Sequence, residues 1–339
     1  MQLTRPTLSC LIVAEVGSVH DGSFGNAKHL VKASANCGVG AIKFQTHIAS
    51  AETLPDAPMP AYFQAEPRYH YFERTAFTRE QWQWLKAYCE ENKIEFLSSP
   101  FSAKAVELLE SVGVTRYKVP SGEVTNLPLL EVIAQTRKPV LLSSGMSSWA
   151  ELDEAVNVIL RYQDQLTVLQ CTSEYPCSYE SVGLNVMVEM RDRYHQPVGL
   201  SDHTLTPYAS LAAVVLGASV IEKHFTFSRL MYGSDALHSV EPTELTGLVQ
   251  GIRAIEKILA SPVDKDAMLE RLRNMKEIFQ KSVVALMDIP AGTVITSEMV
   301  GLKKPGTGIS PSRLQEIIGQ RVRRNIPRDS LLVEEDLCE

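Results

Sequence analysis

Most of the short apolar runs in this 339-residue chain end in residues that could do acid–base chemistry or bind a ligand. Glu15 ends the first run, Lys43 and Gln45 lie two residues apart in the second, and Lys118 lies in the fourth. The remaining runs end at Ser98 and Ser99, at Ser143 and Ser144, at Thr172, Ser173 and Tyr175, at Ser201, Asp202 and His203, and at Glu222 and His224. A single residue of this kind is commonly a hydrogen-bonded structural group. The same bias after eight runs is hard to explain by packing.

Two of these residues are lysines inside apolar runs. Lys43 and Lys118, together with the nearby serines, are donors suited to phosphate or carboxylate groups. Burying two ammonium groups is costly unless an anion neutralises them. The pattern therefore predicts a small substrate that carries several negative charges.

Two histidines form a second candidate set. His203 and His224 end consecutive runs, and adjacent strands lie about 4.8 Å apart, so both imidazoles could reach one ion. Such a pair suits a divalent metal that acts as a Lewis acid. Asp235, in the turn after the last run, is a candidate third ligand or base. The alternative is a pair of histidines that only form structural hydrogen bonds.

The apolar runs alternate with helical patterns along most of the chain. The predicted strands are 11–16, 41–46, 95–99, 116–120, 139–143, 166–171, 197–201 and 218–224, and the predicted helices lie near 25–37, 79–92, 103–112, 127–136, 149–161, 184–194, 207–217 and 242–260. Continuous apolar strands indicate burial on both faces of a parallel sheet. Eight such units favour a (β/α)8 TIM barrel, whose active site lies at the carboxyl ends of the strands. A doubly wound sheet is the alternative, but no strand is followed by GxGxxG.

The connection over residues 47–78 is much longer than an ordinary loop and is rich in Tyr, Phe and Arg. Long loops at a barrel mouth commonly form lids or contact the substrate. We expect Arg68, Tyr71 and Arg74 to help select the substrate. The alternative is an insertion that only packs on the rim.

The pattern changes near residue 265. The expected domains are a catalytic barrel over 1–265, a charged helical linker over 266–281 and a small domain over 282–339. Within the small domain, DIPAGTVITSEMV at 288–300 resembles NIPRDSLLVEEDL at 325–337. These two hairpin-like halves predict a compact pseudo-symmetric domain, unless the likeness is a coincidence between two amphipathic turns.

Composition limits the class of protein. The net charge of −7 without a basic tail argues against a nucleic-acid partner. No apolar run approaches the roughly 20 residues of a membrane helix, and Glu15 interrupts the first run, which excludes a signal peptide there. The six cysteines show no CxxC pair, so a reducing cytoplasm is the expected location.

Eight motifs together carry a family resemblance. The chain contains, in order, AEVGSVHDGS, IKFQT, KVPSGEVTNLPLL, LLSSGM, QCTSEYP, GLSDHT, EKHFT and KKPGTGISP. This ordered set resembles the sialic acid synthase family from about residue 10 to the end. The last motif resembles that family's C-terminal antifreeze-like domain, a SAF domain of the β-clip type.

The resemblance implies condensation of phosphoenolpyruvate with an N-acetylmannosamine-type sugar, giving N-acetylneuraminate or a related nonulosonic acid and phosphate. It implies Mn²⁺, or else Mg²⁺ or Co²⁺, on His203 and His224, and a domain-swapped homodimer. The positions that match substrate contacts are Lys43, Gln45, Lys118, Ser121, Ser143, Ser173, Tyr175, Ser201 and Lys304, and those that match positions at the reacting centre are Glu15, Glu123 and Asp235. Glu15 is expected to stabilise charge at C2 of phosphoenolpyruvate or to activate a water.

Three positions depart from the pattern of the resembled family. Val19 replaces an Asn that often precedes the first-strand histidine, Ser173 stands where some members have Asn, and Lys304 stands where many have Arg. These changes leave open a legionaminate or pseudaminate synthase that uses a 2,4-diacetamido sugar. A metal-dependent sugar-phosphate aldolase and a non-catalytic polysaccharide-binding protein are further alternatives. Neither requires phosphate release from phosphoenolpyruvate.

Overall fold

A computed structural model describes residues 9–58 and 65–338 of the chain. The chain divides into two compact units, the first ending at Ser261 and the second beginning at Pro262. The first unit holds all the strands that end in the candidate site residues, and the second holds Lys304.

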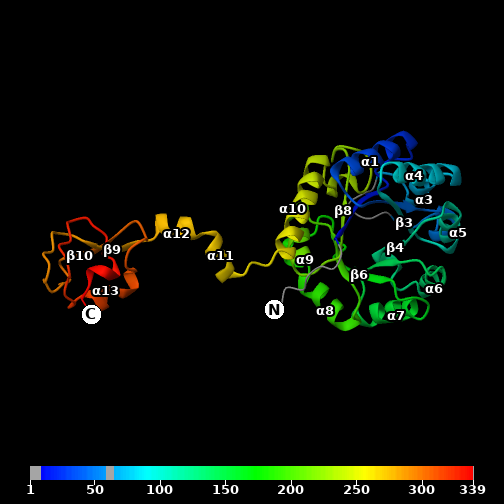
Figure 1. The fold of residues 1–339 in the computed structure, drawn as a ribbon. Helices are drawn as coiled ribbons and strands as arrows, with labels where there is room; N and C mark the ends of the chain where they lie inside the picture. The colour runs from blue at the N-terminus through cyan, green and yellow to red at the C-terminus, as the bar shows by residue number, and fades with distance from the viewer. Residues whose placement is uncertain (1–8, 59–64, 339) are drawn as a thin grey trace. The chain divides into compact units, whose positions relative to one another are not determined.

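Eight parallel strands form the sheet of the first unit (Figure 1). They are β1 Leu11–Gly17, β2 Ala41–Thr46, β3 Glu95–Pro100, β4 Tyr117–Val119, β5 Val140–Ser143, β6 Leu166–Cys171, β7 Val198–Asp202 and β8 Val220–His224. Their spatial order is β3-β2-β1-β8-β7-β6-β5-β4. Because β3 and β4 also contact each other, the sheet comes round into a nearly closed barrel. The predicted TIM barrel is confirmed.

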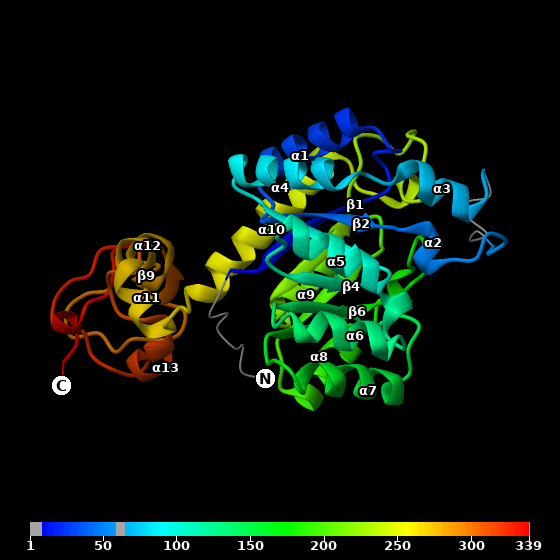
Figure 2. The ribbon, with the colours of Figure 1, turned by 90° about the vertical axis from the view of Figure 1, so that its right-hand side faces the viewer.

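Helices surround this sheet, as Figure 2 shows. The helices that alternate with the strands are α1 Phe24–Cys37, α4 Arg79–Glu91, α5 Ala103–Val112, α6 Leu127–Gln135, α7 Trp149–Leu160, α8 Leu184–Tyr194, α9 Tyr208–Val215 and α10 Pro242–Ala260, with short 3₁₀ turns at Ser121–Glu123, Tyr179–Ser181 and Ala236–His238. Several begin at side-chain caps. Thr78 and Gln81 form a capping box at α4, and Ser148 and Glu151 form one at α7. Within the described residues no helix has the length and apolar character to cross a membrane.

The barrel interior changes character along the strands. At its amino end the layer is apolar and is formed by Val13, Ala41, Leu97, Leu141, Leu169 and Val220. Two residues further along the same strands the interior carries Glu15, Lys43, Ser99, Ser143, Cys171 and Glu222. Since side chains alternate between faces, each of these polar groups points the same way as the apolar residue below it. The apolar layer therefore forms the floor of a polar site.

The long connection after β2 contains two helices, α2 Ala49–Glu52 and α3 Arg68–Thr75. Tyr71 on α3 is almost fully buried, so this connection packs against the barrel and is more than an open loop. Arg74 was predicted to help select the substrate. In the structure it forms ion pairs with Asp21 and Glu66.

The second unit begins with two short helices, α11 Lys265–Arg271 and α12 Arg273–Phe279, over the predicted linker. An antiparallel pair follows, β9 Ser282–Ala285 with β10 Val300–Lys303, and then α13 Leu314–Ile317 and short 3₁₀ turns at Pro311–Arg313 and Glu334–Asp336. The two repeated segments pair with each other, because Ile289 and Ile326 exchange both backbone hydrogen bonds at 2.8 Å. The likeness between them therefore corresponds to a direct contact.

Candidate active site

A cavity of about 430 Å³ opens at the carboxyl ends of the barrel strands, where TIM-barrel enzymes place their catalytic groups. Twelve of the predicted site residues line it: Glu15, Lys43, Gln45, Lys118, Ser121, Ser143, Ser173, Tyr175, Ser201, His203, His224 and Asp235. They lie on, or in the segment directly after, every strand except β3. The cavity size is typical of a small-molecule site.

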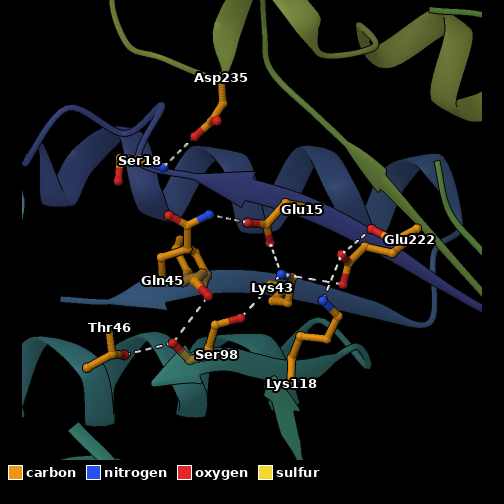
Figure 3. A network of polar contacts seen from close by, with 12 residues as sticks. Glu15, Ser18, Lys43, Gln45, Thr46, Ser98, Lys118, Glu222 and Asp235 are labelled. Carbon is orange, nitrogen blue, oxygen red and sulfur yellow. Dashed lines mark hydrogen bonds and ion pairs between the residues drawn. The ribbon is translucent and has the colours of Figure 1, made fainter. Parts of the chain in front are cut away.

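A buried network of ion pairs forms the base of this cavity (Figure 3). Lys43 Nζ lies 3.1 Å from Glu15 Oε2 and 3.4 Å from Glu222 Oε2. Lys118 Nζ lies 3.3 Å from Glu222 Oε1, which also accepts a 2.9 Å hydrogen bond from Ser201. Glu222 therefore bridges the two lysines.

Glu222 neutralises the two buried lysines. From the sequence, Lys43 and Lys118 were expected to need an anionic substrate for this, but the protein itself supplies the carboxylate. Burial works against the charged form, yet the two lysines lower the pKa of Glu222, and the carboxylates of Glu15 and Glu222 raise that of Lys43. Burial lowers the pKa of Lys118. A bound anion would share these lysines with Glu222, so the pair alone does not demand one.

The two carboxylate oxygens of Glu15 differ in their contacts. Oε1 accepts a 2.8 Å hydrogen bond from Gln45 Nε2, whereas Oε2 forms an ion pair with Lys43 and has no hydrogen-bond partner in the described part of the chain. Burial raises the pKa of Glu15 to about 7, and the positive charge of Lys43 limits the rise. A carboxyl group with this pKa can accept and return a proton near neutral pH.

His203 and His224 lie together, with ring centroids 5.4 Å apart. His203 Nδ1 donates to the carbonyl oxygen of Thr172 at 2.8 Å, which leaves Nε2 with a lone pair. His224 Nδ1 is buried and has no hydrogen-bond partner among the described residues. Burial lowers the pKa of both rings to about 3, so both are neutral. Neutral rings with unused nitrogens are what a divalent metal requires, so the residues fit such an ion.

Asp235 also lines the cavity, and its Oδ2 accepts a 3.4 Å bond from the backbone of Ser18. Burial raises the pKa of this carboxyl. No third Cys, His, Asp or Glu in the described part of the chain joins the two histidines as a metal-binding group. Asp235 therefore stays a predicted base or third ligand, and the two histidines are the residues that could hold a metal ion.

The backbone of β1 makes room for Asp235. Gly17 has φ +49°, and a Cβ at this position would lie 2.3 Å from Asp235 Oδ2. The strand register shifts between Glu15 and Gly17. Only glycine permits both this backbone conformation and this close approach.

The serines occupy the wall formed by β4 to β6. Ser121 Oγ accepts a 3.1 Å bond from the backbone of Gly145 and lies 3.3 Å from Cys171 Sγ. Ser143 Oγ is buried without a partner among the described residues. Ser173 is close enough to Gly145 that a Cβ on the glycine would lie 2.4 Å from its Oγ. Tyr175 stacks on His203, with ring centroids 4.3 Å apart.

Two predicted site residues are not among those that line the cavity. Glu123 follows β4 but binds the side chain of Asn126 at 2.7 Å. Lys304 belongs to the second unit, where its ammonium lies 4.9 Å from the centre of the Phe279 ring. Val19, the first departure from the family pattern, is fully buried and packs in the barrel core.

Several residues of the site were given no specific role from the sequence. Glu222 received no role although it lies two residues before His224, and His47 continues the two-residue spacing of Lys43 and Gln45. The alternation of strand side chains was the available signal for both. Phe72, Phe101 and Cys171 also line the cavity. Nothing in their spacing marks them out.

Comparison with known proteins finds matches over both units of the chain. The sequence profile of the NeuB family matches residues 30–264, and that of the SAF domain matches residues 280–337. The chain is 35% identical to N,N'-diacetyllegionaminic acid synthase of Legionella pneumophila, over 98% of this chain and 95% of the relative. It is 33% identical to human N-acetylneuraminate-9-phosphate synthase, over 96% of this chain and 92% of the relative.

A solved structure, N-acetylneuraminic acid synthetase from Leptospira borgpetersenii serovar Hardjo-bovis, superimposes with a TM-score of 0.69 at 28% identity. The match covers 79% of this chain and 92% of that one. The family profile covers most of the barrel, and the relatives extend over nearly the full length of the chain. The protein is therefore an enzyme that belongs to the NeuB family, with an SAF domain after its barrel.

Proposed function

We propose that this enzyme condenses phosphoenolpyruvate with an open-chain N-acylated amino sugar, giving a sialic-type nonulosonic acid and phosphate. The observation that carries the proposal is the single cavity in which Glu15, both lysines and both histidines meet. The acid synthases to which the chain is similar support the reaction class.

The donor groups suit the two charged ends of phosphoenolpyruvate. Lys43 and Lys118 would share Glu222 with the incoming carboxylate or phosphate, and Ser143 offers a hydroxyl with no other partner among the described residues. Ser121, Ser173 and Ser201 are further hydroxyls on the cavity wall. Such contacts would restrain the substrate so that its methylene carbon faces the sugar.

His203 and His224 would hold a divalent cation, proposed to be Mn²⁺, with Mg²⁺ or Co²⁺ as alternatives. Imidazole nitrogen suits Mn²⁺ better than the harder Mg²⁺. When bound, this ion would supply Lewis acidity toward the sugar's aldehyde. The remaining steps rest on the chain's own residues.

The proposed reaction joins C3 of phosphoenolpyruvate to the aldehyde carbon, and positive charge develops at C2. Glu15 stabilises this charge and accepts a proton from the water that adds to C2. The bond between C2 and the bridging oxygen then breaks, the C2 hydroxyl gives up its proton, phosphate leaves, and C2 becomes the ketone. The two protons of the added water end on the former aldehyde oxygen, which becomes a hydroxyl group, and on phosphate. The pKa of Glu15, raised to about 7, suits this role at neutral pH.

The acceptor is proposed to be a sugar without phosphate. The simplest is N-acetylmannosamine, as an N-acetylneuraminate synthase would use. A specific observation supports a diacetamido sugar instead, because the Legionella relative is named for a product with two N-acetyl groups. The cavity wall also offers Tyr71, Phe72 and Phe101 as apolar surface for a second acetyl group.

The enzyme is further proposed to act in the cytoplasm as a homodimer in which Lys304 of one chain reaches the cavity of its partner. All six cysteines are free thiols, as a reducing compartment would keep them.

A phosphate-release assay tests the proposed function. Purified enzyme with Mn²⁺ and phosphoenolpyruvate is given N-acetylmannosamine, its 6-phosphate or a 2,4-diacetamido sugar in separate reactions. Release that depends on one of these acceptors supports the proposal. No release with any of them would overturn it, and release with the 6-phosphate alone would overturn the choice of acceptor.

A further inference from the structure

A chain of three side chains, Gln45, His47 and Glu52, leads away from Glu15 to the long connection after β2. Gln45 Nε2 donates to Glu15 Oε1 at 2.8 Å, and Gln45 Oε1 lies 3.1 Å from His47 Nε2. His47 Nδ1 lies 2.6 Å from Glu52 Oε1. Glu52 is anchored in turn, because its Oε2 accepts a 3.1 Å bond from the backbone of Ile48.

The proton positions in this chain follow from its ends. An ionised Glu15 can only accept, so the amide nitrogen of Gln45 must face it and the amide oxygen must face His47. His47 Nε2 therefore carries a hydrogen. At the other ring nitrogen, one proton lies between Nδ1 and the Glu52 carboxylate, so both contacts of the imidazole are hydrogen bonds.

His47 is held as firmly by stacking as by hydrogen bonding. Its ring lies between Phe72 and Phe101, with centroid distances of 3.7 and 4.2 Å and interplanar angles of 7 and 18°. The side chains of His47 and Glu52 are each only 5% exposed. A buried imidazole fixed on both faces and at both nitrogens has no freedom to rotate.

The amide of Gln45 has two orientations of nearly equal shape, and the wrong one would present oxygen to the Glu15 carboxylate. The hydrogen on His47 Nε2 selects the right one. We infer that His47 and Glu52 are positioning residues that act through Gln45 to hold Glu15 Oε1, leaving Oε2 for the reaction. This inference rests on the proposed function, and none of the three is required to touch the reacting atoms.

The test compares kinetics of matched variants. His47→Phe keeps an aromatic ring between Phe72 and Phe101 but removes both hydrogen bonds. We expect kcat to fall about 10- to 100-fold, as expected for a misplaced catalytic group, while KM for phosphoenolpyruvate stays within about threefold. His70→Phe is the control, since His70 is 70% exposed on α3, and it should keep wild-type kcat.

Glu52 supplies a second pair of variants. In Glu52→Gln the amide nitrogen can donate to the lone pair of His47 Nδ1 while the amide oxygen accepts from the backbone of Ile48. The hydrogen on His47 Nε2 is then kept, so kcat should stay within about threefold of wild type. Glu52→Leu leaves that nitrogen unpaired and should resemble His47→Phe. The inference predicts a higher kcat for the Gln variant than for the Leu variant, whereas a residue that serves only hydrophobic packing would not favour Gln. Equal kcat values for the two variants would overturn the inference.

A crystal structure of His47→Phe separates this inference from the proposed function. The 2.8 Å contact between Gln45 and Glu15 should be lost, whatever reaction the enzyme catalyses. If the contact persists, or if an active wild type and His47→Phe share the same kcat, the positioning role is wrong. If the contact is lost but no acceptor supports phosphate release, the positioning role stands and the proposed function fails.

Discussion

At the residue scale the proposed reaction depends on Glu15, whose two carboxylate oxygens have different surroundings. Gln45 binds one, and Lys43 pairs with the other. Burial raises the pKa of this carboxyl group to about 7. A carboxyl group with such a pKa can exchange a proton near neutral pH, as an acid–base role requires.

Glu15→Gln removes the base and keeps the side-chain shape. We expect kcat to fall by about 10²- to 10⁴-fold, the usual contribution of a positioned general base. Binding of phosphoenolpyruvate should be retained or slightly tighter, because a negative charge beside Lys43 is lost. Steady-state kinetics give kcat, and isothermal titration calorimetry gives the affinity. A variant with normal turnover would remove Glu15 from the chemistry.

The two histidines give a prediction that needs no activity measurement. Purified protein stripped with EDTA should bind one Mn²⁺ per chain, measured by electron paramagnetic resonance of the free ion. His203→Ala and His224→Ala should each weaken binding by at least about tenfold, since each removes a ligand. His29→Ala, an exposed histidine on α1, is the control. Unchanged affinity in both site variants would contradict the metal site.

At the element scale, β1 sets the position of the site through an irregularity. The register shift between Glu15 and Gly17 and the φ of +49° at Gly17 bring the strand end against Asp235 and Gln45. A regular strand would point these groups elsewhere.

Gly17→Ala tests this arrangement. The added Cβ would lie 2.3 Å from Asp235 Oδ2 and would need a left-handed backbone. We expect a loss of about 1–3 kcal/mol in unfolding free energy together with a reduced kcat. Gly247→Ala on α10 meets nothing within 4 Å and should stabilise by about 0.5–1 kcal/mol. Urea unfolding measures both, and equal effects would show that Gly17 is not constrained.

The helices and strands were largely predictable from the sequence, because each is marked by a pattern within its own residues. Strands β1 to β8 read as apolar runs because both faces are buried, and capping residues such as Ser148 mark where helices begin. Within the site, the spacing of Lys43, Gln45 and His47 follows from strand alternation. The bridge by Glu222 was not foreseen, because no local pattern shows which of several interior charges will pair across the barrel.

At the scale of the whole molecule, the second unit is well defined in itself. The internal repeat made its compactness predictable, since Ile289 and Ile326 pair directly. The sequence could not show which surface its Lys304 meets, because a single chain carries no pattern that specifies a partner. A role for Lys304 in the active site of a neighbouring chain is therefore best tested by mixing two variants of the protein.

Two inactive variants should restore each other if Lys304 acts across a dimer. Glu15→Gln lacks the base and Lys304→Ala lacks the contact, and a mixed dimer contains one intact site. After mixing under conditions that exchange subunits, we expect about a quarter of wild-type activity per chain. Each variant alone, treated identically, is the control. No gain on mixing, with exchange verified by mass spectrometry of tagged chains, would show that Lys304 does not act in trans.

The central claim is that water adds to C2 of phosphoenolpyruvate and phosphate departs with its bridging oxygen. Phosphoenolpyruvate labelled with ¹⁸O at that bridging oxygen tests it most directly. With the accepted sugar, mass spectrometry should find the label in phosphate and none in the nonulosonic acid, with the two products formed in equal amounts. Label retained in the acid, or an acid formed without phosphate, would contradict the account.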